Sequence, residues 1–325
     1  MPKVNAVAKK IIANVEKVII GKRQEVILAL MSTFAEGHIL LEDVPGVAKT
    51  MLARALSVSF GCDFKRVQCT PDLLPSDITG ASIFNPKTTE FEFRAGPLFT
   101  SILLADEINR TTPRTQAALL EAMAERRVSV DGETYLLDRP FLVIATQNPV
   151  DQEGTFPLPE AQLDRFMFKV VVPFLNRGEL NEVVSRTILK QPIELPKLLD
   201  SERILQLRTT LAKVVVADPI RDYACRLVLA THPDSEFAPA SVKEYTRWGA
   251  SPRAAQGLIK AGRVRALSDG RAHVAFEDIR HFAPEVLQHR VLLNYDGQAE
   301  NVSVPRLVED CVANVPEDAA QAVGV

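Results

Sequence analysis

Residues 41–50, LEDVPGVAKT, end in the lysine–threonine pair of a phosphate-binding loop. Such a loop has glycine six positions before the lysine and again directly before it; here those positions hold Asp43 and Ala48. The apolar run 38–41 leads into the stretch, and residues 51–60 follow it with the pattern of a helix. Strand, glycine-containing loop and helix is the order of a P-loop, so the stretch predicts a nucleotide site despite its missing glycines.

The remaining residues of this loop supply what phosphate binding needs. Backbone N–H groups and the N-terminus of a helix attract anionic oxygens. In this arrangement Lys49 adds a positive charge at the β- and γ-phosphates, and the hydroxyl of Thr50 binds Mg²⁺. Gly46 keeps the loop flexible. We expect the carboxylate of Asp43 to point away from the phosphates and to accept a local hydrogen bond.

A second motif, ILLADE at residues 102–107, is an apolar strand that ends in two carboxylates. Burying a carboxylate without a partner is costly, so such an ending indicates a use for the pair. An aspartate at this place, Asp106, can hold Mg²⁺ through its water shell. The adjacent Glu107 can orient or deprotonate a water that attacks the γ-phosphate.

Three further polar residues fit the same chemistry. Asn148 ends the apolar run 141–148, and its amide can hold the attacking water or a γ-phosphate oxygen. Arg165 lies between a short helix and a strand, and Arg253 lies at a helix start that Ser251 can cap. A guanidinium at the γ-phosphate stabilises transition-state charge, although each arginine taken alone also fits a surface salt bridge.

The pattern of elements predicts two domains. Apolar strands alternate with helices as far as residue 174, which indicates an α/β core with a central parallel sheet. Within it, residues 84–99 predict an extended insertion, and residues 126–137 predict a hairpin turning at Asp-Gly. Residues 175–311 read as a smaller helical domain, with helices expected at 179–190, 201–214, 219–231, 252–267 and 276–289. We expect residues 312–325 to fray.

Composition limits the class of protein. The chain has 325 residues with 24% charged residues and a formal net charge of −3, which disfavours a dedicated nucleic-acid binder. Its four cysteines have the spacing of neither a zinc site nor a disulfide framework. No apolar run approaches a membrane span, and the N-terminus lacks the apolar region of a signal peptide, so we expect a cytoplasmic protein.

These motifs, in this order, resemble the MoxR family of AAA+ ATPases. The resemblance rests on LLEDVPGVAKT, FNPKTTEFEFRAGPLF, ILLADEINR, VSVDGETYLL, IATQNPVDQEGTFPLPEAQLDRF and WGASPRA, and it runs from about residue 5 to residue 295. It implies a P-loop AAA+ core followed by a helical lid domain. Residues 84–99 are similar to the helix-2 insertion of this clade, and residues 127–137 to its pre-sensor-1 hairpin.

The resemblance also implies roles for individual residues. Glu107, Asn148, Arg165 and Arg253 match the catalytic glutamate, sensor 1, the arginine finger and sensor 2. Thr50 and Asp106 match the residues that hold Mg²⁺. The residues expected to contact ATP are Ile20, Gly21, Asp43, Val44, Pro45, Gly46, Val47, Ala48, Lys49, Thr50, Met51 and Asp106, with residues 18–21 beside the adenine.

By the same resemblance, the expected function is Mg²⁺-dependent ATP hydrolysis that drives chaperone-like remodelling, assembly or metal-cofactor maturation of partner protein complexes. The chain is expected to form a homo-oligomeric ring, a hexamer, in which Arg165 of one subunit reaches the ATP of its neighbour. A client protein complex, with a separate von Willebrand factor A domain protein, is the implied partner.

Three other readings stay open on the sequence. A nucleic-acid motor or loader of the same superfamily could place Arg126 and Arg127 in a central pore, and salt-dependent binding to DNA or RNA would indicate it. A module that senses ATP without hydrolysis would draw its support from Asp43. A small-molecule kinase is disfavoured, because Glu107 and a helical lid with its own arginine suit hydrolysis better.

Overall fold

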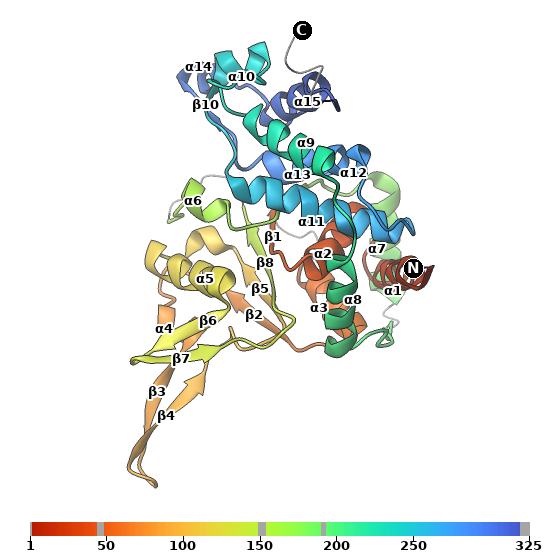
Figure 1. Ribbon diagram of the computed structural model, residues 1–325. Helices are drawn as coiled ribbons and strands as arrows, with labels where there is room; N and C mark the ends of the chain where they lie inside the picture. The colour runs from red at the N-terminus through yellow and green to blue at the C-terminus, as the bar shows by residue number, and fades with distance from the viewer. Residues whose placement is uncertain (1, 44–48, 149–153, 190–192, 319–325) are drawn as a thin grey trace. The chain divides into compact units, whose positions relative to one another are not determined.

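The computed structural model describes residues 2–43, 49–148, 154–189 and 193–318 (Figure 1). The chain divides into two compact units, which we treat separately. The sheet unit holds residues 7–165 and 170–206, and the helical unit holds residues 1–6, 166–169 and 207–325. Among the described residues, no helix combines the length and the apolar character that crossing a bilayer requires.

A five-stranded sheet forms the centre of the sheet unit. Its strands, in spatial order, are β2 (Phe64–Gln68), β5 (Ile102–Asp106), β8 (Leu142–Gln147), β1 (Ile39–Asp43) and β9 (Phe168–Val172). The pairings of β2 with β5, of β5 with β8 and of β8 with β1 are parallel. β5 is buried along its whole length, as the unbroken apolar sequence of a central parallel strand requires. The carboxyl ends of β1, β5 and β8 therefore meet at one edge of the sheet.

Helices surround this sheet. They are α1 (Pro2–Glu16), α2 (Arg23–Phe34), α3 (Lys49–Phe60), α4 (Pro75–Thr79), η1 (Ile108–Arg110), α5 (Pro113–Glu125), α6 (Glu160–Leu163), α7 (Arg177–Leu189) and α8 (Ser201–Ala212), and the helical unit takes the first residues of α1 and the end of α8. Buried His38 links α5 to β8. Its Nδ1 accepts from the N–H of Val143 on β8 at 3.0 Å, and its Nε2 contacts the carbonyl of Met123 on α5 at 3.1 Å.

Two hairpins project side by side from the sheet unit (Figure 1). The first joins β3 (Gly80–Asn85) to β4 (Glu90–Ala95), and the second joins β6 (Arg127–Val130) to β7 (Glu133–Leu136). Residues 131 and 132 have φ angles of 52° and 86°, as the predicted Asp-Gly turn requires. The first hairpin begins at residue 80, before the predicted start at 84, because only its second strand shows the alternating phenylalanines that signal a strand.

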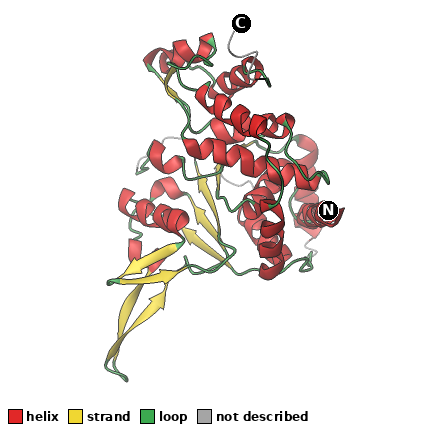
Figure 2. Cartoon of the chain, in the orientation of Figure 1, coloured by secondary structure: helices red, strands yellow, loops and turns green. Residues whose placement is uncertain are grey.

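The helical unit is built of helices and one pair of short strands (Figure 2). They are α9 (Asp218–Leu229), α10 (Ala240–Tyr245), β10 (Thr246–Trp248), α11 (Pro252–Ser268), α12 (Phe276–His281), α13 (Ala283–Leu287), β11 (Leu292–Leu293), α14 (Tyr295–Ala299) and α15 (Val304–Asn314). The single helix expected over 276–289 is wrong: it is two helices, with Pro284 in the first turn of the second. Proline has no N–H for the preceding turn, which accounts for the break.

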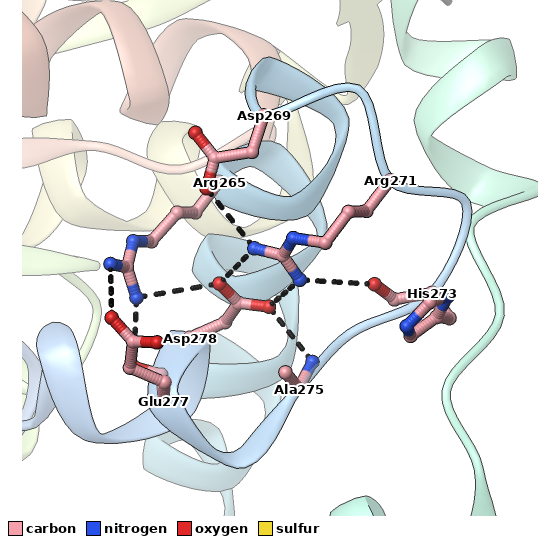
Figure 3. A network of polar contacts seen from close by, with 7 residues as sticks. All are labelled: Arg265, Asp269, Arg271, His273, Ala275, Glu277 and Asp278. Atoms are coloured by element: carbon pink, nitrogen blue, oxygen red, sulfur yellow. Dashed lines mark hydrogen bonds and ion pairs between the residues drawn. The ribbon is translucent and has the colours of Figure 1, made fainter.

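A buried carboxylate joins α11 to α12 (Figure 3). Asp278 is fully buried and accepts two hydrogen bonds from Arg271, at 2.6 and 2.7 Å, and one of 2.8 Å from the N–H of Ala275. Arg265 lies 3.4 Å from the same carboxylate and also binds Glu277. Burial alone would raise the pKa of Asp278, but these hydrogen bonds and the two guanidinium charges outweigh it and lower the pKa below its ordinary value.

Two expectations about boundaries differ from the structure. Residues 312–317 of the tail expected to fray are packed: α15 continues to residue 314, and buried Arg226 donates to the carbonyls of Pro316 and Glu317 at 2.6 and 3.0 Å, while residues 319–325 lie outside the described residues. The predicted domain boundary at 174 also differs from the compact units, since residues 175–206 group with the sheet. In that segment the N–H groups of residues 198 and 199 donate to the carbonyl of Ser59 on α3.

Candidate nucleotide site

The predicted phosphate-binding residues lie where β1 gives way to α3. Lys49 and Thr50 are the first two residues of α3, both half-buried, and Met51 follows them with 51% of its surface exposed. The N-terminus of this helix attracts anions. Residues 44–48 (Val44, Pro45, Gly46, Val47 and Ala48) and the side chain of Asp43 lie outside the described residues.

A pocket brings Lys49 together with the segment expected at the adenine. Its lining is formed by Ile19, Lys22, Glu25, Leu41, Lys49, Leu52 and Val172. Ile19 belongs to the segment 18–21 that the resemblance places beside the adenine, and Ile20 and Gly21, between Ile19 and Lys22 in the chain, are not part of the lining. Gly21 has a φ of 70°, and a Cβ there would lie 2.3 Å from Cδ of Glu179, so glycine suits this turn. The pocket has room for about one water molecule, so it shows that Lys49 and residue 19 are neighbours and is not itself a nucleotide cavity.

Two charged residues of this pocket were not foreseen. Lys22 is buried, and its ammonium donates to the carbonyl of Pro173. Glu25 is also buried, and burial raises the pKa of its carboxyl above the ordinary value, partly offset by a hydrogen bond from its own backbone and by the charge of Lys22. Both lie at the start of α2, a helix buried on most sides, and no motif in the sequence marks them.

Asp106 ends β5 and is 7% exposed. Its Oδ1 accepts a hydrogen bond of 2.7 Å from the hydroxyl of Thr146, and its Oδ2 accepts one of 2.7 Å from Arg66. These partners come from the neighbouring strands β8 and β2, so the sheet itself supplies them. A carboxylate and a hydroxyl are the hard oxygen donors that Mg²⁺ prefers, so Asp106 and Thr50 are the residues that could hold it.

Glu107 follows with a left-handed backbone, φ 58° and ψ 52°. Such a conformation costs a residue with a side chain roughly 1–3 kcal/mol and is concentrated at functional sites. Its N–H donates to the hydroxyl of Thr146 at 2.8 Å. Its Oε2 accepts from Gln68 and Arg110, each at 3.2 Å. The strained backbone and these bonds fix where the carboxylate lies.

Asn148 directly follows β8 and is half-buried. Its backbone carbonyl accepts a hydrogen bond of 3.1 Å from the amide of Asn109, which belongs to η1 just after the two carboxylates. The structure therefore joins the end of β8 to the end of β5, as their parallel pairing led us to expect.

The two predicted arginines lie in different compact units. Arg165, in the sheet unit, follows α6; it is half-buried and donates to the carbonyl of Leu120 on α5 at 2.7 Å. Arg253, in the helical unit, is exposed near the start of α11. Its N–H donates to Oγ of Ser251 at 3.1 Å, which confirms the predicted cap.

The sequence did not identify the polar partners of the two carboxylates. Arg66 and Gln68 point from β2, and Thr146 from β8, into the same group of side chains. Only the strand order could have revealed them, because β2 precedes β5 by nearly 40 residues in the chain. Cys69, the next residue, is buried beside them; burial, and then the two carboxylates, raise the pKa of its thiol to about 12, so it stays protonated.

Comparison with known proteins agrees with this geometry. Residues 38–168 match the model of the ATPase family associated with various cellular activities (AAA), and residues 239–311 match the AAA lid domain. The parallel sheet, the helix that begins at Lys49 and the strand that ends in Asp106 and Glu107 are what such a core requires. The fold and the site thus define an AAA+ ATPase with a helical lid.

Within that class, the chain belongs to the MoxR family. It is 41% identical to Chaperone MoxR1 of Mycobacterium tuberculosis over 300 residues, which cover 92% of this chain and 79% of that protein. It is 46% identical to the uncharacterized protein YeaC of Bacillus subtilis over 309 residues, covering 94% and 93% of the two chains. The crystal structure of a candidate ATPase from Cytophaga hutchinsonii has a TM-score of 0.90 and 39% identity, covering 97% and 96%. The chain is accordingly an ATPase with chaperone-like activity.

Proposed function

We propose that this ATPase uses Mg²⁺, acts as a hexameric homo-oligomeric ring and spends the free energy of ATP hydrolysis on remodelling partner proteins. The observation that supports the proposal most is the meeting of the two carboxylates, Asp106 and Glu107, with the end of β8 at the sheet edge where β1 leads towards Lys49.

The residues around Lys49 fit the nucleotide. Lys49 would contact the β- and γ-phosphates at the N-terminus of α3, and the segment with Ile20 and Gly21, whose neighbour Ile19 lines the same small pocket as Lys49, would lie beside the adenine. Thr50 and Asp106 would hold the Mg²⁺. When bound, Mg²⁺ neutralises charge on the transferred phosphoryl group.

Glu107 is the proposed base that orients and deprotonates the attacking water. Both of its hydrogen bonds, from Gln68 and Arg110, go to Oε2. Oε1 takes part in neither contact, so this oxygen can accept a proton from water without breaking them. Asn148, tied to η1 through its carbonyl, would present its side-chain amide to the water or to the γ-phosphate.

Two arginines would complete the site. We assign Arg165 to the γ-phosphate held by the neighbouring subunit of the ring, and Arg253 to a second contact with the γ-phosphate from the helical unit. A guanidinium at this position stabilises the charge of the transition state and contributes ~10³-fold or more in rate. Hydrolysis would then depend on contact between subunits.

The client is proposed to be a protein complex that the motor assembles or loads with a metal cofactor, in company with a separate von Willebrand factor A domain protein. The relative named Chaperone MoxR1 supports a protein rather than a small molecule as the object of the activity.

The test measures the ATP hydrolysis rate per subunit against protein concentration, with Mg²⁺ and with EDTA. We expect the rate to rise steeply as the ring assembles, in parallel with the mass found by light scattering, and to vanish in EDTA. A rate per subunit that is independent of concentration, from a protein that remains monomeric, would contradict the ring.

A further inference from the structure

Three consecutive residues after α13 grip the backbone that immediately follows Arg165. Arg290 donates to the carbonyl of Phe166 at 2.6 Å, and His289 Nε2 contacts the same carbonyl at 3.1 Å. Gln288 donates to the carbonyl of Lys169 at 2.6 Å. We call Gln288, His289 and Arg290 the carbonyl clamp. All of these contacts lie within the helical unit, to which residues 166–169 belong.

The charged and polar side chains of the clamp are buried, and burying them costs free energy of folding. Arg290 is 7% exposed and His289 is 5% exposed. Arg290 also donates to the carbonyls of Met167, at 3.5 Å, and Val286, so its planar fork spans several backbone acceptors. Taking a guanidinium out of water costs several kcal/mol, and apolar residues of similar volume often stabilise a core better. Stability alone is therefore a weak reason for an arginine here.

The histidine of the clamp is held in one form. Burial, and then the charge of Arg290, lower the pKa of His289 well below its ordinary value, so the ring is neutral. A neutral imidazole has one N–H, and the contact with the Phe166 carbonyl places it on Nε2. Nδ1 is buried and has no hydrogen-bond partner among the described residues. The ring thus contributes a single directed donor.

The gripped segment has little freedom of its own. Phe166 and Phe168 are fully buried, and the ring of Phe168 packs against Phe282 with centroids 6.0 Å apart. On the other side of the peptide bond, Arg165 belongs to the sheet unit and donates to the carbonyl of Leu120. The guanidinium of Arg165 is thus held by the Leu120 carbonyl, and the backbone that follows Arg165 is held by the clamp.

We propose that the carbonyl clamp positions Arg165 for catalysis. The clamp residues do not touch nucleotide; they fix the backbone from which the guanidinium extends, so that the helical unit of a subunit controls the arginine which that subunit presents to its neighbour. This inference rests on the proposed role of Arg165 at the ATP of the next subunit. Misplacing a catalytic group by about 1 Å can lower a rate ~10²-fold, so a loosened clamp has a measurable effect.

A double-mutant cycle of Arg290→Met and Arg165→Ala tests this. Alone, Arg165→Ala is expected to lower kcat ~10³-fold, and Arg290→Met ~10–100-fold, with the Kd of a fluorescent ATP analogue and ring assembly unchanged. In the Arg165→Ala background, Arg290→Met should lower kcat no further, because the residue it positions is gone. Gln288→Ala, which removes one bond of the clamp, gives the same comparison with a smaller disturbance of the core.

Arg226→Met is the matched control. Arg226 is also a buried arginine of the helical unit that holds two backbone carbonyls, those of Pro316 and Glu317, away from Arg165 in the chain. It should lower stability as Arg290→Met does, while kcat stays within twofold of the wild type. Two results would contradict the proposed positioning role: losses of kcat from Arg290→Met and Arg165→Ala that multiply in the double variant, or a loss of kcat from Arg226→Met as large as that from Arg290→Met. If Arg165→Ala alone left kcat unchanged, the proposed finger itself would fail, and the clamp with it.

Discussion

The hydroxyl of Thr146 donates a 2.7 Å hydrogen bond to the buried carboxylate of Asp106, across the parallel pairing of β8 with β5. The same oxygen accepts the N–H of Glu107 at 2.8 Å. One side chain thus orients the proposed metal ligand and holds the strained backbone of the proposed base. The hydroxyl has one proton, which goes to Asp106, so a lone pair of the same oxygen accepts the N–H of Glu107.

Thr146→Val removes that hydroxyl while keeping the shape of the side chain. A buried N–H and a buried carboxylate oxygen lose their partner, so the free energy of unfolding should fall by ~1–3 kcal/mol. We expect kcat for ATP to fall about tenfold or more, as misplaced catalytic groups lose rate. Urea unfolding and steady-state kinetics check both, and Thr146→Ser should restore them. A valine variant with wild-type kcat would show that this hydroxyl does not orient the site.

Lys49→Ala should weaken nucleotide binding. The lysine lies at the start of α3 and on the pocket wall, and its charge is proposed to contact the β- and γ-phosphates. We expect the Kd of a fluorescent ATP analogue to rise at least ~10-fold, since a lost charge-assisted contact is worth about 1.5–3 kcal/mol. Arg54→Ala is the control, because Arg54 is an exposed cation of the same helix. Equal weakening by both variants would argue against a specific phosphate contact.

Two inactive variants should restore hydrolysis when their subunits are mixed. Arg165→Ala subunits keep an intact ATP site, and Glu107→Gln subunits keep an intact arginine. If Arg165 acts on the neighbour's ATP, random mixing in equal amounts completes about a quarter of the interfaces. ATP hydrolysis by the mixture should therefore reach a quarter of the wild-type rate. A mixture as inactive as its components would place Arg165 on the nucleotide of its own subunit.

Acid should weaken the helical unit through Asp278. Its pKa is lowered in the folded protein, so the stabilisation is present above the unfolded value of 3.8 and is lost as the pH falls through the folded value. Asp278→Asn should cost about 1–3 kcal/mol at pH 7, because the buried side chain can no longer accept both hydrogen bonds from half-buried Arg271, and should flatten the loss of stability in acid. Urea unfolding from pH 7 to pH 3 measures this.

The control for this prediction is Asp269→Asn. Asp269 binds the same Arg271 at 3.1 Å, but its side chain is 53% exposed, and exposed pairs contribute less than about 1 kcal/mol. If Asp278→Asn and Asp269→Asn lowered the free energy of unfolding equally, the burial of Asp278 would add nothing to the strength of its contact with Arg271.

Much of the fold follows from patterns that are local in sequence. Apolar runs that end in Asp106 and near Asn148 predict buried strands, and the structure has β5 and β8 there. The Asp-Gly pair at 131–132 predicts its hairpin, because few residues accept two consecutive positive φ angles. These features depend on backbone geometry that short stretches of sequence determine by themselves.

The features that sequence patterns did not predict depend on neighbours in space. Arg66 and Thr146 meet Asp106 only because β2 and β8 flank β5 in the sheet. The carbonyl clamp joins residues 119–124 positions apart, and nothing near Gln288 marks it as special. Single-sequence periodicity reports which side of an element is buried, but not which element covers it.

Glu107 is proposed to activate the water that attacks ATP, and the substitution Glu107→Gln probes this role. The substitution keeps the shape of the side chain and removes its basicity. Single-turnover hydrolysis and the Kd of ATP should be measured together on the assembled protein. We predict that the rate falls ~10²–10⁴-fold, the range that general-base catalysis contributes, while the Kd stays within a few-fold of the wild type. A single-turnover rate equal to that of the wild type would contradict the claim.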